Sequence, residues 1–133
     1  MNLVIDIGNT YFKSAVFSNN DALGFQHEKN ENFEIFISKI LKSYSKIKKT
    51  IVSNVSEINH ELFFENHKID FLNVSNELNL PFENRYETPK TLGSDRIALI
   101  SSAVFEYPSS NSLIIDAGTC LTMDVINNKN QYC

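Results

Sequence analysis

Two short segments of the chain carry residues that could bind phosphate. Residues 6–10 read Asp-Ile-Gly-Asn-Thr and residues 116–119 read Asp-Ala-Gly-Thr, so each has an aspartate two residues before a glycine. Glycine at a hairpin tip lets backbone N–H groups approach an anion, the threonine hydroxyl adds a hydrogen bond, and the aspartate can hold a cation that bridges phosphates. Either segment alone is typical of an ordinary turn. Because both follow an apolar strand, the pair favours a clamp that holds a polyphosphate from two sides.

A third segment whose residues could take part in binding or catalysis lies between them, at residues 91–96 (Thr-Leu-Gly-Ser-Asp-Arg). The carboxylate of Asp95 could take a proton from a hydroxyl within hydrogen-bond reach, and the planar fork of Arg96 could bind a carboxylate. The alternatives are structural, since Ser94 and Asp95 could cap the helix that follows and Arg96 could pair with a surface acid. Capping and catalysis by Asp95 are compatible, so the residue types leave both roles open.

The elements that would position the first segment form a hairpin. Residues 3–5 are an apolar run that predicts a buried strand, residues 13–17 alternate in polarity like a second strand, and the turn residues between them predict an antiparallel pairing. A third strand is expected at residues 23–27. The clearest periodic signal is helical and follows directly; it comprises Phe33, Phe36, Ile37, Ile40, Leu41 and Tyr44.

The rest of the chain is expected to mix strands and helices. We predict a helix at residues 58–66 with Ile58 and Leu62 facing inward, and a helix at 93–105. The second helix has an apolar face made of Ile97, Ile100 and Val104. The other expected elements are an irregular segment at 76–90 and strands at 50–54, 69–74, 113–115 and 121–126. This order predicts an α/β fold, with a mixed sheet opened by a hairpin and helices on its faces.

The composition is that of a globular protein. At 133 residues the chain can bury one hydrophobic core, and its 42% hydrophobic and 21% charged residues argue against disorder. A formal net charge of −4, with no basic run longer than residues 46–49, argues against a nucleic-acid partner. No apolar stretch is long enough for a membrane span, and the first residues do not resemble a signal peptide. Two cysteines, Cys120 and Cys133, suit neither a disulfide framework nor a four-ligand metal site, so we expect a cytoplasmic protein with reduced thiols.

Taken together, the three segments resemble a known family. Residues 6–10 with Lys13, and residues 116–119 with Thr122 and Asp124, look like the two phosphate motifs of the acetate and sugar kinase, Hsc70 and actin superfamily. Residues 93–96 are similar to the Gly-x-Asp-Arg pantothenate motif of type III pantothenate kinases, an element that separates this family from other superfamily members. The resemblance covers essentially the whole chain.

This resemblance implies a fold and a division into domains. We expect residues 1–112 to form a ribonuclease H-like/actin-like ATPase domain with a mixed five-stranded sheet and flanking helices, and residues 113–133 to be the truncated start of a second such domain. The family's chain continues well beyond this point and supplies most of the adenosine pocket there. The strand at 121–126 is therefore expected to lack its neighbours and to present an unprotected edge. Little activity is expected from the chain alone.

An activity is implied as well, namely ATP-dependent phosphorylation of pantothenate to 4′-phosphopantothenate at the start of coenzyme A synthesis. The expected cofactors are ATP, magnesium and a monovalent cation, potassium or ammonium, and the full-length protein is expected to be a homodimer. The resemblance makes Asp95 the general base and Asp116 a ligand of the monovalent cation. The nucleotide-binding residues are Asp6, Ile7, Gly8, Asn9, Thr10, Tyr11, Phe12, Lys13 and Thr119. The residues that contact pantothenate are Tyr86, Gly93, Ser94, Asp95 and Arg96.

Several residues also have plainer explanations. Lys13 could be an exposed strand lysine and Tyr86 a packing residue. Cys120 stands where the family commonly has a small residue such as alanine, and we interpret it as packing. The three histidines are expected on the surface; they are His27, His60 and His67.

Two other functions stay open beside the kinase. A non-catalytic regulator could have kept the fold, but the presence of Asp6 and Asp95 argues against it. A metal-dependent nuclease on the related ribonuclease H-like fold could use Asp6 and Asp116 as ligands. Because nucleic-acid binding depends on basic surfaces, the acidic balance of the chain and residues 93–96 argue against a nuclease.

Overall fold

The computed structural model describes residues 1–132, which form two compact units. The first unit is Met1–Asn73 and the second begins at Val74. This division differs from the domain boundary expected between residues 112 and 113, which concerns the longer family protein and stays a prediction. Within the described residues, no helix combines the length and the apolar character needed to cross a membrane.

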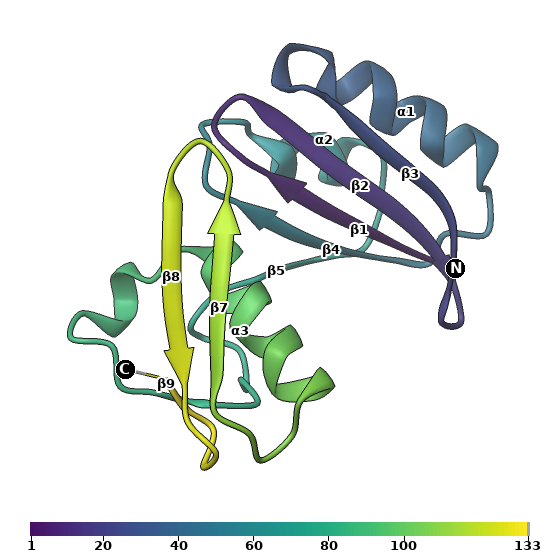
Figure 1. Ribbon diagram of the computed structural model, residues 1–133. Helices are drawn as coiled ribbons and strands as arrows, with labels where there is room; N and C mark the ends of the chain where they lie inside the picture. Colours follow the sequence, from purple (N-terminus) through teal and green to yellow (C-terminus); the bar gives the residue numbers. More distant parts are fainter. Residues whose placement is uncertain (133) are drawn as a thin grey trace. The chain divides into compact units, whose positions relative to one another are not determined.

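The first unit is built on a mixed five-stranded sheet (Figure 1). Its strands are β1 (Asn2–Ile7), β2 (Tyr11–Ser18), β3 (Asp21–Lys29), β4 (Lys49–Asn54) and β5 (Phe71–Asn73), in the spatial order β3-β2-β1-β4-β5. β1 pairs with β2 in antiparallel fashion and with β4 in parallel. The predicted hairpin, third strand and mixed five-stranded sheet are therefore confirmed.

Helices cover one face of this sheet. They are α1 (Phe33–Ser43), which follows a short 3-10 turn η1 (Asn30–Asn32), and α2 (His60–Asn66). Because successive strand side chains point to opposite faces, Leu3, Ile5 and Ile7 all turn toward the helices and are buried. Phe33 lies at the centre of an aromatic cluster, with ring centroids 5.3 Å from Phe12, 5.7 Å from Phe63 and 6.5 Å from Phe64. This cluster anchors β2, and so the turn that precedes it, to both helices.

The predicted inward face of α2 was wrong for Leu62, whereas Ile58, which precedes the helix, packs against the core. Leu62 is 54% exposed, while Phe63, Phe64 and His60 are buried. The helix begins only after Asn59, whose side chain accepts the N–H of Leu62 at 3.0 Å. With the helix starting there, the two phenylalanines face the sheet and Leu62 faces solvent.

His60 is also not the surface residue that we predicted, since only 6% of it is exposed. Its Nδ1 accepts from the side-chain amide of Asn54 at 2.8 Å, and its Nε2 donates to Oδ1 of Asn73 at 2.7 Å. A neutral imidazole satisfies both bonds. His60 therefore ties the end of β4 to the end of β5, whereas His27 and His67 are exposed as expected.

The second unit combines one helix with a small sheet. Its elements are β6 (Glu83–Asn84), a 3-10 turn η2 (Pro89–Thr91), α3 (Ser94–Glu106), β7 (Ser112–Ala117), β8 (Leu121–Ile126) and β9 (Gln131–Tyr132). The strands lie in the order β6-β9-β8-β7. Ile97, Ile100 and Val104 are buried on one face of α3, as predicted, and pack in a cluster with Ile126 and Tyr132.

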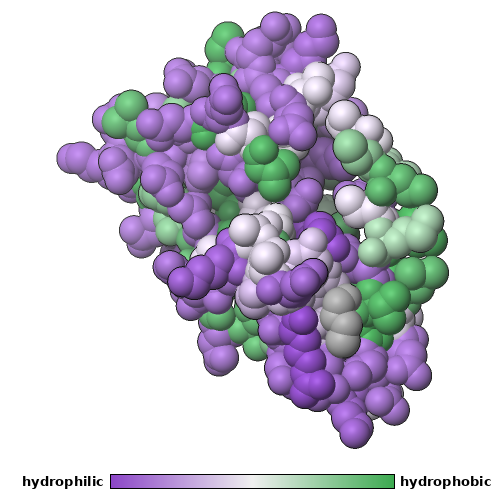
Figure 2. Space-filling model, turned by 90° about the vertical axis from the view of Figure 1, so that its left-hand side faces the viewer, coloured by the Kyte–Doolittle hydropathy of each residue, from purple (hydrophilic) through white to green (hydrophobic). Residues whose placement is uncertain are grey.

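The expectation that the strand at 121–126 lacks neighbours was wrong at its end, where Ile126 pairs with Tyr132, whereas residues 121–125 have a described partner only in β7. β8 lies between β7 and β9, and the edge strands of this sheet are β6 and β7. One face of the β7–β8 hairpin is apolar and more than half exposed; it carries Leu113, Ile115, Leu121, Met123 and Val125. Hydrophobic side chains gather in a band at the right of the face drawn in Figure 2.

Candidate functional site

The first hairpin requires glycine for a steric reason. The N–H of Gly8 donates to the carbonyl of Tyr11 at 3.0 Å and closes the turn between β1 and β2. A Cβ on Gly8 would lie 3.2 Å from that same carbonyl oxygen, a tight contact that a side chain would relieve by displacing the carbonyl. Asn9 and Thr10 follow at the tip and are exposed. The turn is thus narrow and open at its tip, as the phosphate-loop hypothesis requires.

Asn30 holds this turn from one side, a role that the sequence analysis missed. Its side-chain amide donates to the carbonyl of Gly8 at 2.8 Å, and its backbone N–H donates to the carbonyl of Thr10 at 3.0 Å. In a trans peptide the C=O and N–H groups point in opposite directions. Because the Gly8 carbonyl points at Asn30, the N–H of Asn9 points away from it. Asn30 therefore orients the N–H of Asn9, which could donate a hydrogen bond to a phosphate oxygen.

The other predicted residues of this segment divide between the two faces of the sheet. Ile7 and Phe12 are fully buried in the core, which leaves only their backbone groups for a ligand. Asp6 and Lys13 are direct cross-strand partners and lie on the face opposite the helices. Directly opposed residues have Cβ atoms roughly 5 Å apart. The structure thus brings an acid and a base together beside the turn.

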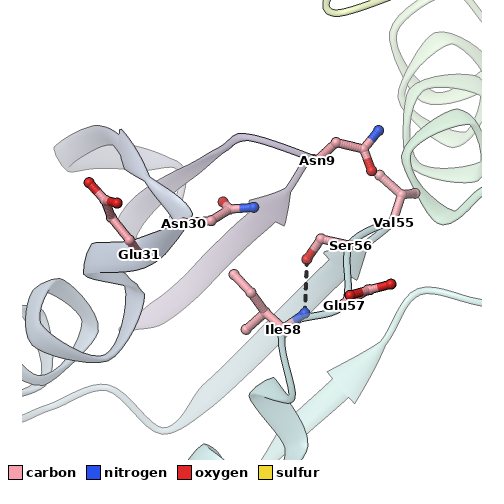
Figure 3. A pocket seen from close by; sticks show the side chains of 7 residues that line it. All are labelled: Asn9, Asn30, Glu31, Val55, Ser56, Glu57 and Ile58. Atoms are coloured by element: carbon pink, nitrogen blue, oxygen red, sulfur yellow. Dashed lines mark hydrogen bonds between the residues drawn. The ribbon is translucent and has the colours of Figure 1, made fainter.

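A pocket of about 680 Å³ opens beside the turn, where the parallel strands β1 and β4 end (Figure 3). Its lining residues are Asn9, Asn30, Glu31, Val55, Ser56, Glu57 and Ile58. Crevices at the carboxyl ends of parallel strands are common ligand sites. Glu31 and Glu57 would repel a bare anion, so the pocket suits a polar or cation-bound group.

Enlarging Gly8 tests the geometry of the turn. In a Gly8→Ala variant the methyl group must displace the Tyr11 carbonyl, which turns the Asn9 N–H out of place. We expect ATP binding to weaken by about tenfold, since a misaligned hydrogen bond to a charged group is worth roughly 1.5 kcal/mol. Isothermal titration with ATP measures this. Gly24→Ala is the control away from the turn, because its Cβ would meet the hydroxyl end of the Tyr44 side chain at 2.9 Å instead of a backbone atom of the turn. Equal affinities for the Gly8→Ala variant and the wild type would contradict the phosphate role.

The second hairpin is also closed by a glycine N–H, but its turn is one residue shorter than the first. The N–H of Gly118 donates to the carbonyl of Cys120 at 3.1 Å, and Asp116 lies directly opposite Thr122 on the face of the sheet that α3 covers. The hydroxyl oxygen of Thr122 is buried and has no hydrogen-bond partner among the described residues. Thr119 and Cys120 are exposed at the tip, so the interpretation of Cys120 as a packing residue was wrong.

The residues present there fit a hard cation, such as the monovalent ion that the family resemblance implies. The Asp116 carboxylate and the unpartnered Thr122 hydroxyl supply oxygen ligands from neighbouring strands, and hard cations prefer oxygen. Within residues 1–132 there is no group of three or more His, Cys, Asp or Glu that could form a transition-metal site.

Asp95 lies in the first turn of α3, where its Oδ1 accepts the backbone N–H of Arg96 at 2.8 Å. The residue at the N-cap position is Gly93, which provides no side-chain cap. Asp95 thus fulfils part of the capping role with one oxygen, and its second oxygen can still face a ligand. The side chain is half-buried, so a ligand can reach it.

Arg96 pairs with a buried acid instead of the surface acid that the sequence suggested as an alternative. Its guanidinium contacts the carboxylate of Asp124, whose side chain is 1% exposed, and also the hydroxyl of Tyr132 at 2.7 Å. Hydrogen bonding to Asp124 is the main cause that raises the pKa of Arg96 above its ordinary value. Burial, followed by the hydrogen bond to Asp124, raises the pKa of Tyr132. Both shifts favour the charged arginine and the neutral tyrosine.

Tyr86 lies against this pair. Its ring stacks on Tyr132 with centroids 5.9 Å apart, and the guanidinium carbon of Arg96 is 5.2 Å from the centroid of the Tyr86 ring. Tyr86 thus has the packing role that we considered for it, and it also forms one wall around Arg96. Of the predicted pantothenate contacts, the structure brings Tyr86 and Arg96 together and places Ser94 and Asp95 on the adjoining first turn of α3.

Known proteins with similar sequences cover the same span. The family model for type III pantothenate kinases matches residues 2–133. The type III pantothenate kinase of Flavobacterium psychrophilum is 43% identical over 134 residues, which is 99% of this chain and 55% of that protein. That of Christiangramia forsetii is 45% identical over 128 residues, 94% of this chain and 52% of that protein. The chain therefore spans about half the length of the curated relatives that it matches.

Solved structures with a similar fold include two longer proteins. A Campylobacter jejuni protein described as a Baf family transcriptional activator has a TM-score of 0.56 and 23% identity, over 98% of this chain and 50% of that one. A protein of Sinorhizobium meliloti described as a 2-dehydro-3-deoxygalactonokinase has a TM-score of 0.55 and 8% identity, over 100% and 52%. At such low identities these likenesses concern the fold alone. The family match and the sequence identities together show that the chain belongs to the type III pantothenate kinase family.

Proposed function

We propose that the protein phosphorylates pantothenate to 4′-phosphopantothenate at the expense of ATP, as the first step of coenzyme A synthesis. The observation that supports this most directly is the pair of matching hairpins, each closed by a glycine N–H and each preceded by an aspartate. A kinase needs little covalent chemistry from the protein, because positioning and charge stabilisation account for most of the catalysis. Two phosphate-binding turns and one positioned base meet that need.

In this proposal each residue has a stated task. Asp95 accepts the proton of the pantothenate hydroxyl while that oxygen attacks the γ-phosphorus of ATP, with ADP as the leaving group. The turn at residues 6–10 and Lys13 bind phosphate oxygens of the nucleotide, and Thr119 adds a contact from the second hairpin. Arg96 and Tyr86 bind pantothenate, together with Gly93 and Ser94.

Cations complete the site in this proposal. Magnesium and a monovalent cation, potassium or ammonium, would neutralise charge on the phosphates, and Asp116 would hold the monovalent ion. We further propose that the full-length protein works in the cytoplasm as a homodimer.

The test is an assay of the full-length protein with pantothenate, ATP and magnesium, in which 4′-phosphopantothenate is identified by mass. We expect turnover in potassium to exceed that in sodium by at least about tenfold, because a cation of the wrong size stabilises the phosphate charge poorly. Equal rates in the two salts would remove the cation role from Asp116. No product in any salt would contradict the kinase and favour the non-catalytic regulator.

A further inference from the structure

The side chain of Arg96 has a fixed distribution of hydrogen-bond donors. Its Nε donates to both carboxylate oxygens of Asp124, at 3.1 and 3.2 Å. Its Nη2 donates to Oδ1 of Asp124 at 2.5 Å and to the hydroxyl of Tyr132 at 2.7 Å. These bonds use the hydrogens of Nε and Nη2. A hydrogen bond with the Tyr86 side chain also helps to raise the pKa of Arg96, and the donors that remain for a ligand belong to Nη1.

Tyr132 connects the two charged groups. Its hydroxyl accepts from Arg96 and donates to Oδ1 of Asp124 at 2.7 Å. Asp124 is 2% exposed and Tyr132 is 1% exposed, so neither can exchange these bonds for water. The three residues come from α3, β8 and β9, and the network therefore fixes the guanidinium against the sheet of the second unit.

We propose that Asp124 and Tyr132 are positioning residues that hold Arg96 so that its Nη1 donates to the carboxylate of the substrate. This inference rests on the proposed function, in which Arg96 binds pantothenate. It changes the expected mode of binding, because the edge formed by Nε and Nη2 is occupied by Asp124 and cannot form a bidentate fork with the substrate. Since Asp124 offsets the charge of Arg96, recognition of the substrate carboxylate depends on where Nη1 points more than on net charge.

A Tyr132→Phe variant tests the inference with the least disturbance. The ring can keep its contacts with Tyr86 and with Phe82, whose ring centroids lie 5.9 and 6.1 Å away. Only the hydroxyl is lost, and with it one of the bonds that orient Nη2. We expect the KM for pantothenate to rise about fivefold, the effect of one hydrogen bond, while kcat and the KM for ATP stay within about twofold.

Two further readouts separate positioning from a general loss of structure. The second substrate is the analogue of pantothenate in which a hydroxymethyl group replaces the carboxylate. The ratio of kcat/KM for pantothenate to kcat/KM for this analogue should fall by about the same fivefold in the Tyr132→Phe variant. The Nε–H signal of Arg96 in a nitrogen–proton NMR spectrum should shift. Tyr107→Phe is the matched control, since Tyr107 is 64% exposed at the end of α3 and should leave all values unchanged.

The outcomes are distinguishable. If the wild type is active and Tyr132→Phe raises the KM equally for pantothenate and for the neutral analogue, or leaves both unchanged, the positioning role is overturned while the kinase stands. If the wild type phosphorylates no pantothenate, the proposed function fails and this assignment fails with it. An Asp124→Asn variant should show the same loss of preference, because its amide would present a donor to Arg96.

Discussion

An Asp95→Asn variant of the full-length protein should lose between about 10²- and 10⁴-fold in kcat for pantothenate phosphorylation, the usual contribution of a general base. Asparagine has the same shape as aspartate but cannot accept the hydroxyl proton. Its Oδ1 can still accept the N–H of Arg96, so the first turn of α3 should stay as it is. Steady-state kinetics with varied pantothenate measure the change, and the KM should move much less than kcat.

The control for this variant is an exposed acid far from the helix start. Asp70 is exposed and its backbone carbonyl accepts from Thr50, so Asp70→Asn removes a charge without removing that bond. We expect its kcat to match that of the wild type. A kcat for Asp95→Asn within about tenfold of wild type would mean that another group, or water, accepts the proton.

The largest expected effect on stability comes from Asp124→Ala. This change leaves the guanidinium of Arg96 without its carboxylate and deprives the Tyr132 hydroxyl of its acceptor. Removing one partner of a buried ion pair costs about 3–5 kcal/mol in the free energy of unfolding. Because the chain contains no tryptophan, urea unfolding is best followed by circular dichroism.

A double variant shows whether the unpaired charge is the cause. Apolar replacement of both partners often restores stability that a single replacement removes. We therefore expect Arg96→Met combined with Asp124→Leu to recover most of the loss. A cost below about 1 kcal/mol for Asp124→Ala, or a double variant as unstable as the single one, would show that the pair contributes little to folding.

Sequence patterns predicted those parts of the fold that depend on neighbours in the chain. The apolar run before Asp6 and the alternation after Lys13 placed the first hairpin, and the spacing of Ile97, Ile100 and Val104 placed the inner face of α3. The repeated aspartate and glycine marked both turns. All of these signals lie within a few residues of the feature that they predict.

Contacts between distant residues could not be predicted in this way. Asn30 reaches the Gly8 carbonyl across 22 positions, and Arg96 reaches Asp124 across 28. A single asparagine or aspartate forms no sequence pattern from which such a distant partner can be predicted. His60 was placed wrongly for the same reason, because its two amide partners lie on different strands.

The side chains of α2 that face the sheet were predicted wrongly for another reason. The segment from Ile58 to Asn66 is short. In so short a helix, the residue at which the helix starts decides which side chains face the sheet. The cap at Asn59 decided the register. Asparagine is frequent both at caps and in loops, so its presence alone did not reveal where the helix starts.

The two sheets differ in whether the first strand of the glycine hairpin is paired along its second edge. β1 and β7 each open a hairpin, and β1 has β4 along its second edge, whereas β7 has no described neighbour there. That edge offers backbone donors and acceptors beside the exposed side chains of Leu113 and Ile115. Such an edge recruits extended chains without regard to their sequence. The exposed apolar side chains along the free edge of β7 therefore make this edge a site at which crowding promotes aggregation.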